Sequence, residues 1–414
     1  MDNSSIKSLQ LGNGLTLIAE CMPWLESASF AISVPAGCQF DPESKLGLAN
    51  FVCEMVQRGC GSLDSRQFIE KLESIGVDYS SSVSVYHTHF GGALPARKLA
   101  DALQVYSDVL RNPVMPEDQM EDGRMVCMQE IRAIEDDLPQ RVMLSLRQRQ
   151  YGDPLGRSCQ GNYESIQSVS YQDVGDFYRQ FYRPNGLVIG VAGNIDWDAL
   201  CQQVESLFGD WQEVAVDEIQ VRDQSVGVHH IDFESQQTHI GLAFPSIPYS
   251  NDNYFVARGA VGVLSDGMSS RLFSEIREKR GLCYSVYASL HSLKDRGSII
   301  SYVGTGADRA QQSLDVLIEE LTRLSEGITN EELERLKIQV RSSLVMQQES
   351  SRSRASSISS DYFHLGRART LDEVNQLIND LSVERINKYL ADNPPANFNL
   401  VTLGSQPLEF TMDT

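Results

Sequence analysis

Apolar and polar positions follow two different periods along the chain. The segment Leu15–Ala19 and the apolar residues that alternate between Ala28 and Val34 have the period of two that is typical of strands. The segments 102–110 and 313–321 instead repeat apolar residues at the spacing of an amphipathic helix. Both kinds of segment occur throughout the sequence, which favours an α+β or mixed-sheet fold.

Several of these segments recur about 211 residues apart. Each of the two helical segments is followed by a second predicted helix. Pro116 opens one that runs through Ile131, and the capping box Thr329–Glu332 opens the other, which runs to about residue 348. The period is too long for a solenoid repeat and indicates a duplicated domain.

A second pair of segments repeats at the same offset. Ser170 and Ser382 each cap a predicted helix that ends in an aromatic-rich turn. Each helix is followed by proline and then by a strand that stops at glycine, at Leu187–Gly193 and at Phe398–Gly404. We therefore expect the two halves to have the same plan.

The length of 414 residues also exceeds that of one ordinary domain. We predict two tandem homologous domains, residues 1–220 and 221–414, each a mixed, largely antiparallel sheet flanked by helices. The acidic stretch 213–225 has weak helical character and is the expected linker.

Charge narrows the classes of partner. The net charge is −21 and the isoelectric point about 4.7. Such a chain repels nucleic acid and anionic membranes and favours basic peptides, although plain solubility is the simpler explanation. The longest apolar run, around 186–192, is too short to cross a bilayer, so no membrane span is predicted. The first seven residues lack the basic and apolar regions of a secretory signal, so we expect a cytoplasmic protein.

The eight cysteines form no Cys-x-x-Cys pair. Their scatter predicts reduced, mostly buried thiols rather than a disulfide framework or a zinc ribbon. The positions are Cys21, Cys38, Cys53, Cys60, Cys127, Cys159, Cys201 and Cys283.

One segment of the first half, residues 47–59, resembles the active-site helix of the pitrilysin/insulinase family, the inverted zinc peptidases that include mitochondrial processing peptidase. That helix carries His-x-x-Glu-His, in which two histidines bind zinc and the glutamate activates water. Matched by position, Asn50 stands at the first histidine, Cys53 at the glutamate and Glu54 at the second histidine. The third family ligand is a glutamate on a later helix, and Glu130 occupies that position.

Three of these four positions are therefore changed, and the resemblance implies a zinc site that is lost. Independently of the family, the seven histidines contain no pair four residues apart that could chelate a metal from one helical face. His87 and His89 alternate on a predicted strand, where a polar strand face is the simpler reading than a shared metal. A site of altered composition for Mg²⁺, Ca²⁺ or zinc at the four positions is the alternative.

The segment 267–287 in the second half resembles the family's C-terminal signature. There an arginine and a tyrosine seven residues apart contact the substrate's backbone carbonyl, and by position these are Arg277 and Tyr284. Gly267 opens a predicted helix, Gly281 is a natural left-handed stop, and Tyr284 begins a strand. A guanidinium and a phenol so placed can both donate to one oxygen on which charge develops.

Taken alone, Arg277 would be read as one more solvated helix charge and Tyr284 as a packed core residue. The match of the whole surrounding segment favours the functional interpretation. The resemblance extends over nearly the whole chain, for example to Leu11–Leu15, Tyr151–Gly156 and Thr238–Pro245. It departs in the loop before the helix, where Leu264–Gly267 replaces the family's glycines.

The resemblance implies the metal-free subunit of a heterodimeric zinc metallopeptidase, with no cofactor on this chain and zinc on a homologous partner chain that carries His-x-x-Glu-His. Arg277 and Tyr284 would serve the partner's active site, and a peptide would bind in extended form at a sheet edge. Two alternatives remain: a non-enzymatic scaffold or peptide-binding subunit of a larger complex, and a homodimer with an altered metal at Glu54 and Glu130.

Overall fold

A computed structural model describes residues 6–222 and 226–410 of the chain. The chain forms two compact units, each composed of three separate segments. Unit 1 comprises Met1–Ala133, Arg157–Val221 and Val345–Thr370, and unit 2 comprises Ile134–Gly156, Arg222–Leu344 and Leu371–Thr414. The expected linker has no helix or regular strand over residues 213–222, and its residues 223–225 lie outside the described part, as do residues 1–5 of the N-terminal segment.

Unit 1 is built on a six-stranded sheet in the order β1-β2-β6-β3-β5-β4. Only the β2–β6 pair is parallel. Its strands are β1 (Ile6–Gln10), β2 (Thr16–Cys21), β3 (Ser27–Val34), β4 (Asp78–Val83), β5 (Thr88–Pro95) and β6 (Val188–Gly193). Its helices are α1 (Leu48–Met55), α2 (Ser65–Ile75), α3 (Leu99–Arg111), α4 (Met120–Asp136), α6 (Tyr163–Ser168), α7 (Tyr171–Phe181), α8 (Trp197–Phe208) and α12 (Ser351–Leu365).

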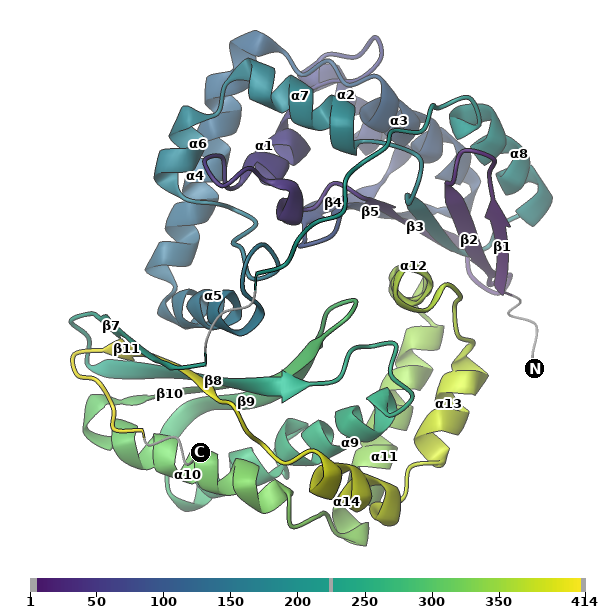
Figure 1. Cartoon of the computed structure of the whole chain (residues 1–414). Helices are drawn as coiled ribbons and strands as arrows, with labels where there is room; N and C mark the ends of the chain where they lie inside the picture. The colour runs from purple at the N-terminus through teal and green to yellow at the C-terminus, as the bar shows by residue number, and fades with distance from the viewer. Residues whose placement is uncertain (1–5, 223–225, 411–414) are drawn as a thin grey trace. The chain divides into compact units, whose positions relative to one another are not determined.

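Unit 2 repeats this plan with a five-stranded sheet in the order β7-β11-β8-β10-β9. Again one pair, β11–β7, is parallel. Its strands are β7 (Val228–Asp232), β8 (Gln237–Ser246), β9 (Cys283–Ser292), β10 (Gly297–Gly306) and β11 (Asn399–Gly404). Its helices are α5 (Leu138–Tyr151), α9 (Tyr254–Ser265), α10 (Ala310–Leu324), α11 (Asn330–Gln348), α13 (Leu371–Asn379) and α14 (Val383–Asp392), together with a π-helix over Phe273–Lys279. The α+β class and the mixed, largely antiparallel sheets are thus confirmed (Figure 1).

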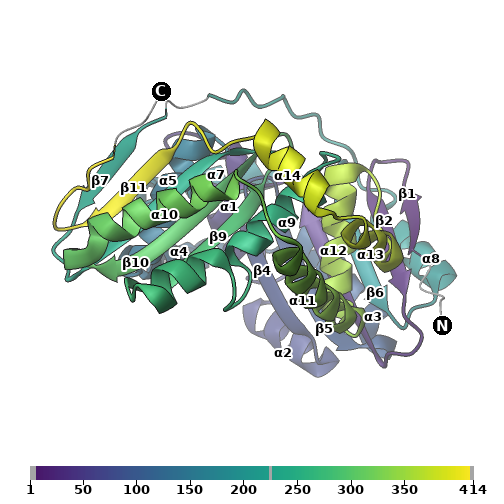
Figure 2. The same ribbon diagram turned by 90° about the horizontal axis from the view of Figure 1, so that it is seen from below.

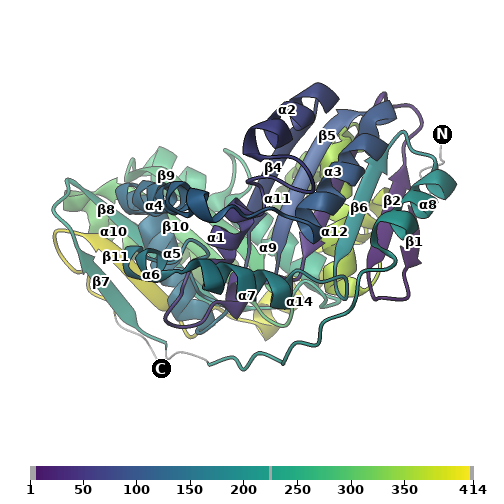
Figure 3. The same cartoon turned by 90° about the horizontal axis from the view of Figure 1, so that it is seen from above.

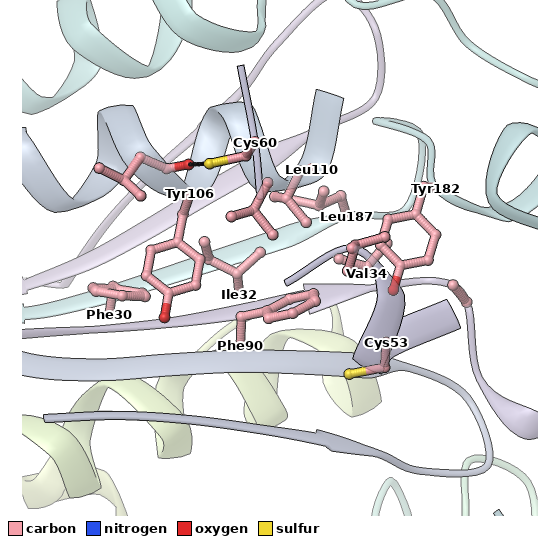
Figure 4. Close-up of a cluster of buried hydrophobic side chains, with 14 of the residues drawn as sticks. Phe30, Ile32, Val34, Cys53, Cys60, Phe90, Tyr106, Leu110, Tyr182 and Leu187 are labelled. Atoms are coloured by element: carbon pink, nitrogen blue, oxygen red, sulfur yellow. Dashed lines mark hydrogen bonds between the residues drawn. The ribbon is translucent and has the colours of Figure 1, made fainter. Parts of the chain in front are cut away.

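The main core of unit 1 lies between the sheet and the helices α1, α3, α7 and α8 (Figures 1 and 3). The apolar residues that alternate along β3, such as Phe30 and Ile32, point into this core together with Phe90 and Tyr106 (Figure 4). Cys53 of α1 belongs to the same cluster. The core of unit 2 lies on the sheet face that is covered by α9 and α10 (Figure 2).

The opposite face of each sheet is covered by a helix from the other half of the sequence. α12 packs on β2, β3 and β6, and α5 packs on β8 and β11. Glycine allows both approaches, because a Cβ at Gly190 would lie 2.5 Å from the Ala355 carbonyl oxygen and one at Gly241 would lie 2.8 Å from Val142 Cγ1. The central strands are therefore buried on both faces: β6 and β11 are buried throughout, and β3 has no exposed position.

The layer between α12 and its sheet combines small apolar clusters around Ile358 and Ala355 with polar contacts. Ser351 hydrogen-bonds Ser29 at 2.8 Å between hydroxyl oxygens, and Arg354 Nε donates to Glu20 Oε2 at 2.6 Å. The Arg354 and Glu20 side chains are only 2% and 1% exposed. This ion pair fixes α12 at one position on the sheet.

Candidate functional site: four altered zinc positions and an arginine–tyrosine pair

Three of the four positions at which the family places its zinc site lie on α1. The helix follows Gly47, which has a φ of 87°. The buried Asp41 carboxylate accepts the backbone N–H groups of Gly47 at 2.7 Å and of Ala49 at 2.8 Å. This contact satisfies donors that would otherwise be unpaired at a helix start and fixes α1, which carries Asn50, Cys53 and Glu54.

The structure brings Asn50 against Glu130 of α4. Asn50 Nδ2 donates to Glu130 Oε2 at 2.6 Å. The same amide nitrogen lies 3.8 Å from the sulfur of buried Cys127. An amide N–H thus stands against the carboxylate oxygen that would otherwise face a cation, so the remaining family-type ligand is already satisfied.

Glu54 is paired within its own helical segment. Arg58, four residues further on, donates to Glu54 Oε1 through Nη2 at 2.8 Å and through Nε at 3.1 Å. Both side chains are largely covered, with 28% of Glu54 and 16% of Arg58 exposed. Arg58 therefore supplies the positive charge next to this carboxylate.

Cys53 belongs to the core. It is 4% exposed, and burial raises the pKa of its thiol to about 12. Without a metal the thiol therefore stays protonated at neutral pH and cannot replace the family's glutamate as a general base. Gln57 Nε2 donates to the Cys53 carbonyl at 2.8 Å.

These observations test whether the zinc implied by the resemblance fits. Zinc needs deprotonated nitrogen, sulfur or carboxylate ligands in a tetrahedral group. Here one position is an amide that donates to Glu130, one is a thiol enclosed in the core and one is a carboxylate paired with arginine, so the residues do not fit zinc. Residues 6–222 and 226–410 contain no group of three or more His, Cys, Asp or Glu side chains that could hold a metal ion. That the chain binds no metal remains a prediction for elemental analysis.

The second candidate region begins at Gly267 and ends in β9. Gly267 and Gly281 have φ values of 85° and 59°, so both glycines adopt the left-handed conformation. The helix predicted between them is present, and its residues Phe273–Lys279 form a π-helix. π-Helical turns are rare and frequently lie at functional sites. Arg277 lies on this turn.

Arg277 lies over two aromatic rings. Its guanidinium carbon is 4.8 Å from the ring centroid of Phe273 and 4.7 Å from that of Tyr284. Cation–π contacts of this kind hold a guanidinium by its faces, while its N–H donors lie at its edge. Arg277 and Tyr284 are thus neighbours in the structure, and Phe273 joins the pair.

The other cations of this segment have carboxylate partners. Lys279 and Arg280 both pair with Glu275, at 2.5 and 2.6 Å, and Arg271 pairs with Glu332 at 2.7 Å. Arg277 makes no ion pair or hydrogen bond with any residue in the described part of the chain. Its donors are therefore available, unlike those of an ordinary helix-surface charge.

Tyr284 is the second residue of β9, an edge strand of the unit 2 sheet. Its side chain is 82% exposed, which excludes the alternative that it is packed in the core. Its hydroxyl has no hydrogen-bond partner among the described residues. The phenol and the guanidinium are thus both able to donate at one sheet edge.

The two histidines of the first half do not form a polar strand face. β5 starts at Thr88, so His87 precedes the strand, and it is buried against the ring of Phe363 at 4.4 Å between centroids. His89 lies on β5 with Nδ1 3.1 Å from Ser33 Oγ and Nε2 3.0 Å from Ser84 Oγ. Burial lowers the pKa of His89 to about 4. Both ring nitrogens of His89 are thus hydrogen-bonded, which leaves neither of them for a metal.

Two residues were missed by the sequence reasoning. Arg58 and Phe273 each lie four residues from a candidate residue, Glu54 and Arg277 respectively. Residues at this spacing face each other on a helix, so the spacing was the signal that could have identified them.

The fold and the two regions define a class: a duplicated α+β protein with a peptidase-like first unit and an arginine–tyrosine pair in the second. Comparison with known families agrees. Residues 18–162 match the model of insulinase (peptidase family M16), and residues 168–340 match that of the peptidase M16 inactive domain. The chain belongs to the M16, or insulinase, family of peptidases.

Two bacterial relatives align over more than nine-tenths of both chains. "Uncharacterized zinc protease YmxG" of Bacillus subtilis is 28% identical over 393 residues, which cover 92% of this chain and 94% of the relative. An "uncharacterized zinc protease" of Rickettsia felis is 26% identical over 387 residues, 93% of each chain.

Solved structures share the fold over almost the whole chain. The peptidase M16 inactive domain from Pseudomonas fluorescens has a TM-score of 0.88 at 20% identity and covers 98% of this chain and 100% of its own. A chain of Complex III2 from Candida albicans has a TM-score of 0.83 at 18% identity and covers 97% and 96%. Within the described residues, no helix combines the length and apolar character needed to cross a membrane.

Proposed function

We propose that this chain is the metal-free subunit of a heterodimeric zinc metallopeptidase. In this proposal, a homologous chain with an intact His-x-x-Glu-His motif supplies the zinc and the general base. Arg277 and Tyr284 of this chain donate hydrogen bonds to the substrate carbonyl. The bacterial relatives are named zinc proteases, which is consistent with peptide hydrolysis as the reaction of such a complex.

The observation that carries the proposal is the unpaired, positioned guanidinium of Arg277. Two rings fix its orientation at 4.7 and 4.8 Å, and every other cation of the segment described above has a carboxylate partner. A preorganised donor next to an exposed phenol suits an oxygen that gains negative charge during hydrolysis. Neither group can activate water, so this role requires a second chain.

The substrate in this proposal is an extended peptide. β9 lies at the edge of its sheet and begins next to Tyr284. An unpaired strand edge can accept backbone hydrogen bonds from an added strand, which supplies affinity with little dependence on sequence. The net charge of −21 favours basic peptides at long range.

The second candidate is a non-enzymatic scaffold or peptide-binding subunit. It is favoured by the first-unit site, where Asn50 already satisfies Glu130 and Arg58 already pairs with Glu54. If this second candidate is right, Arg277 takes no part in catalysis. The two candidates differ in whether the chain stimulates hydrolysis by its partner.

Reconstitution tests the proposal. The chain is co-expressed with a homologous chain from the same genome that carries His-x-x-Glu-His, and hydrolysis of a fluorogenic peptide is measured for each chain and for the purified complex. We expect hydrolysis by the complex only. Failure of the chains to co-purify, or equal activity of the partner alone, would refute the proposal.

Tyr284→Phe tests the phenol within that complex. Loss of a hydrogen bond to a charged oxygen costs about 1.5–3 kcal/mol, so kcat should fall by about tenfold to hundredfold. Tyr287→Phe is the matched control, because Tyr287 lies on the same strand and is also exposed, at 39%. Equal kcat values for the two variants would remove Tyr284 from the reaction.

A further inference from the structure

Two cysteines 121 residues apart in sequence are in direct contact in unit 1. Cys38 starts a short 3₁₀ turn, Cys38–Phe40, on the approach to α1, and Cys159 lies in the loop between α5 and α6. Their sulfur atoms are 2.9 Å apart. A disulfide needs about 2.05 Å, so the sulfurs have to approach each other by only about 1 Å.

The two segments are held together by contacts that do not involve sulfur. Arg157 Nη1 donates to the Asp41 carbonyl, and Ser165 Oγ donates to the Leu46 carbonyl at 2.7 Å. Gly161 packs so closely that a Cβ on it would lie 2.0 Å from the Leu46 carbonyl oxygen. The contact between Cys38 and Cys159 is therefore one part of a tightly packed seam.

The two thiols differ in access to solvent. Cys38 is 0% exposed, whereas Cys159 is partly exposed. The hydrogen bond to Cys159, and then burial, raises the pKa of Cys38 well above its usual value. An oxidant from solvent therefore meets Cys159 first, and Cys38 is placed to resolve the product.

We propose that Cys38 and Cys159 form a reversible disulfide when the chain meets a small-molecule disulfide such as oxidised glutathione. The Cys159 thiolate attacks one glutathione sulfur, which forms a mixed disulfide and releases the first glutathione as a thiolate. The Cys38 sulfur, after loss of its proton, then attacks Cys159 Sγ and releases the second glutathione. The two protein thiols are oxidised by two electrons, and one glutathione disulfide is reduced to two thiols.

The bond would act on the helix that carries the altered zinc positions. Asp41, three residues after Cys38, accepts the N–H groups of Gly47 and Ala49 and so holds the first turn of α1. A disulfide at Cys38 fixes this segment to the loop around Cys159 and also restricts the unfolded chain. The oxidised protein should melt at a temperature several degrees higher and exchange the Gly47 and Ala49 amide protons more slowly.

Thiol counting and peptide mapping test the proposal on the full chain. The reduced protein, which has eight free cysteines, is equilibrated with oxidised glutathione, alkylated under denaturing conditions and digested without reduction. We expect six alkylated cysteines and one cross-linked peptide that joins Cys38 to Cys159. Dithiothreitol should restore all eight.

Two variants separate this bond from general oxidation. Cys159→Ala should show no cross-link and no rise in melting temperature. Cys201→Ala is the matched control, since Cys201 is also a partly exposed thiol of unit 1, and it should keep both effects. The map of the wild-type protein decides the question even if a variant fails to fold. Eight remaining thiols, a stable glutathione adduct on Cys159 or a bridge between any other pair would overturn the proposal.

Discussion

The buried ion pair between Glu20 and Arg354 leads to a sharp prediction of stability. It joins β2 to α12, the helix that the second half of the sequence contributes to unit 1. The Nε to Oε2 distance is 2.6 Å, and the two side chains are 1% and 2% exposed. Within the described residues, Arg354 Nη2 has no hydrogen-bond partner. The guanidinium therefore depends on Glu20 for its compensation.

Glu20→Gln removes the charge and keeps the shape. Removing one partner of a buried ion pair costs about 3–5 kcal/mol, because the remaining charge is uncompensated. Replacing both partners by apolar residues of similar size can be neutral, so Glu20→Met with Arg354→Met should recover most of the loss. Arg352→Ala is the control, since this arginine lies on the same helix and pairs with Asp78 while 45% exposed. An exposed pair contributes about 0–1 kcal/mol.

Tryptophan fluorescence during urea unfolding measures this effect on unit 1 alone. The three tryptophans of the chain, Trp24, Trp197 and Trp211, all belong to unit 1. With a slope of about 1–3 kcal/mol per molar urea, the midpoint of Glu20→Gln should fall by about 1 M or more, and that of Arg352→Ala much less. Equal midpoints for these two variants, or a double Met variant as unstable as Glu20→Gln, would refute the reasoning.

Two further predictions concern the first unit. Burial lowers the pKa of His89 to about 4, against about 6.5 for an exposed histidine, so the folded state binds fewer protons in this range. The stability from the neutral ring is present above pH 6.5 and is lost as the pH falls towards 4, by up to about 3 kcal/mol. The urea midpoint of His89→Gln should therefore vary less with pH between 6.5 and 4 than that of the wild type, and an unchanged slope would contradict this. The triple variant Asn50→His, Cys53→Glu, Glu54→His places the family's motif opposite Glu130. Elemental analysis should find about one zinc ion per chain of this variant. A zinc content equal to that of the wild type would contradict this prediction.

Local signals in the sequence predicted much of the fold. The Thr329–Glu332 capping box does open α11, with Thr329 Oγ1 accepting the Glu332 N–H at 3.3 Å. Ser170 caps α7 in the same way. The two strands that stop at glycine, β6 and β11, occupy equivalent places in the two sheets. These features were accessible because caps and strand ends are decided by neighbouring residues.

The exchange of α5 and α12 between the units was not predicted. A helix pattern indicates which face is apolar, and it carries no information on which sheet that face covers. The contact face of α12 includes the polar residues Ser351, Arg354 and Ser359, so apolar periodicity gives no hint of its burial. The cysteines were expected to be mostly buried, whereas half of them are only partly so.

At the candidate site, too, contacts between residues close in sequence could be predicted, whereas contacts between distant residues could not. The family motif pointed to Arg277 and Tyr284, which lie next to each other in the structure; their role in a reaction stays a prediction. The sequence predicted a helix around Arg277 without its type, because residue type alone does not distinguish the hydrogen-bond pattern of a π-helix from that of an α-helix. The contact of Asn50 with Glu130 joins positions 80 residues apart in the sequence, and only the folded chain shows it.

The contribution of Arg277 to hydrolysis by the reconstituted heterodimer is the most direct test of the account. Arg280→Ala is the matched control, because Arg280 lies three residues away and is engaged by Glu275 at 2.6 Å. Loss of a preorganised donor to a developing oxyanion lowers kcat by about 10²–10³-fold. We therefore predict that Arg277→Ala lowers kcat of the complex by about this factor, while Arg280→Ala stays within about twofold of wild type, because its donors are engaged by Glu275 and do not face an oxyanion. Equal kcat values for Arg277→Ala, Arg280→Ala and wild type would contradict the proposed role in catalysis.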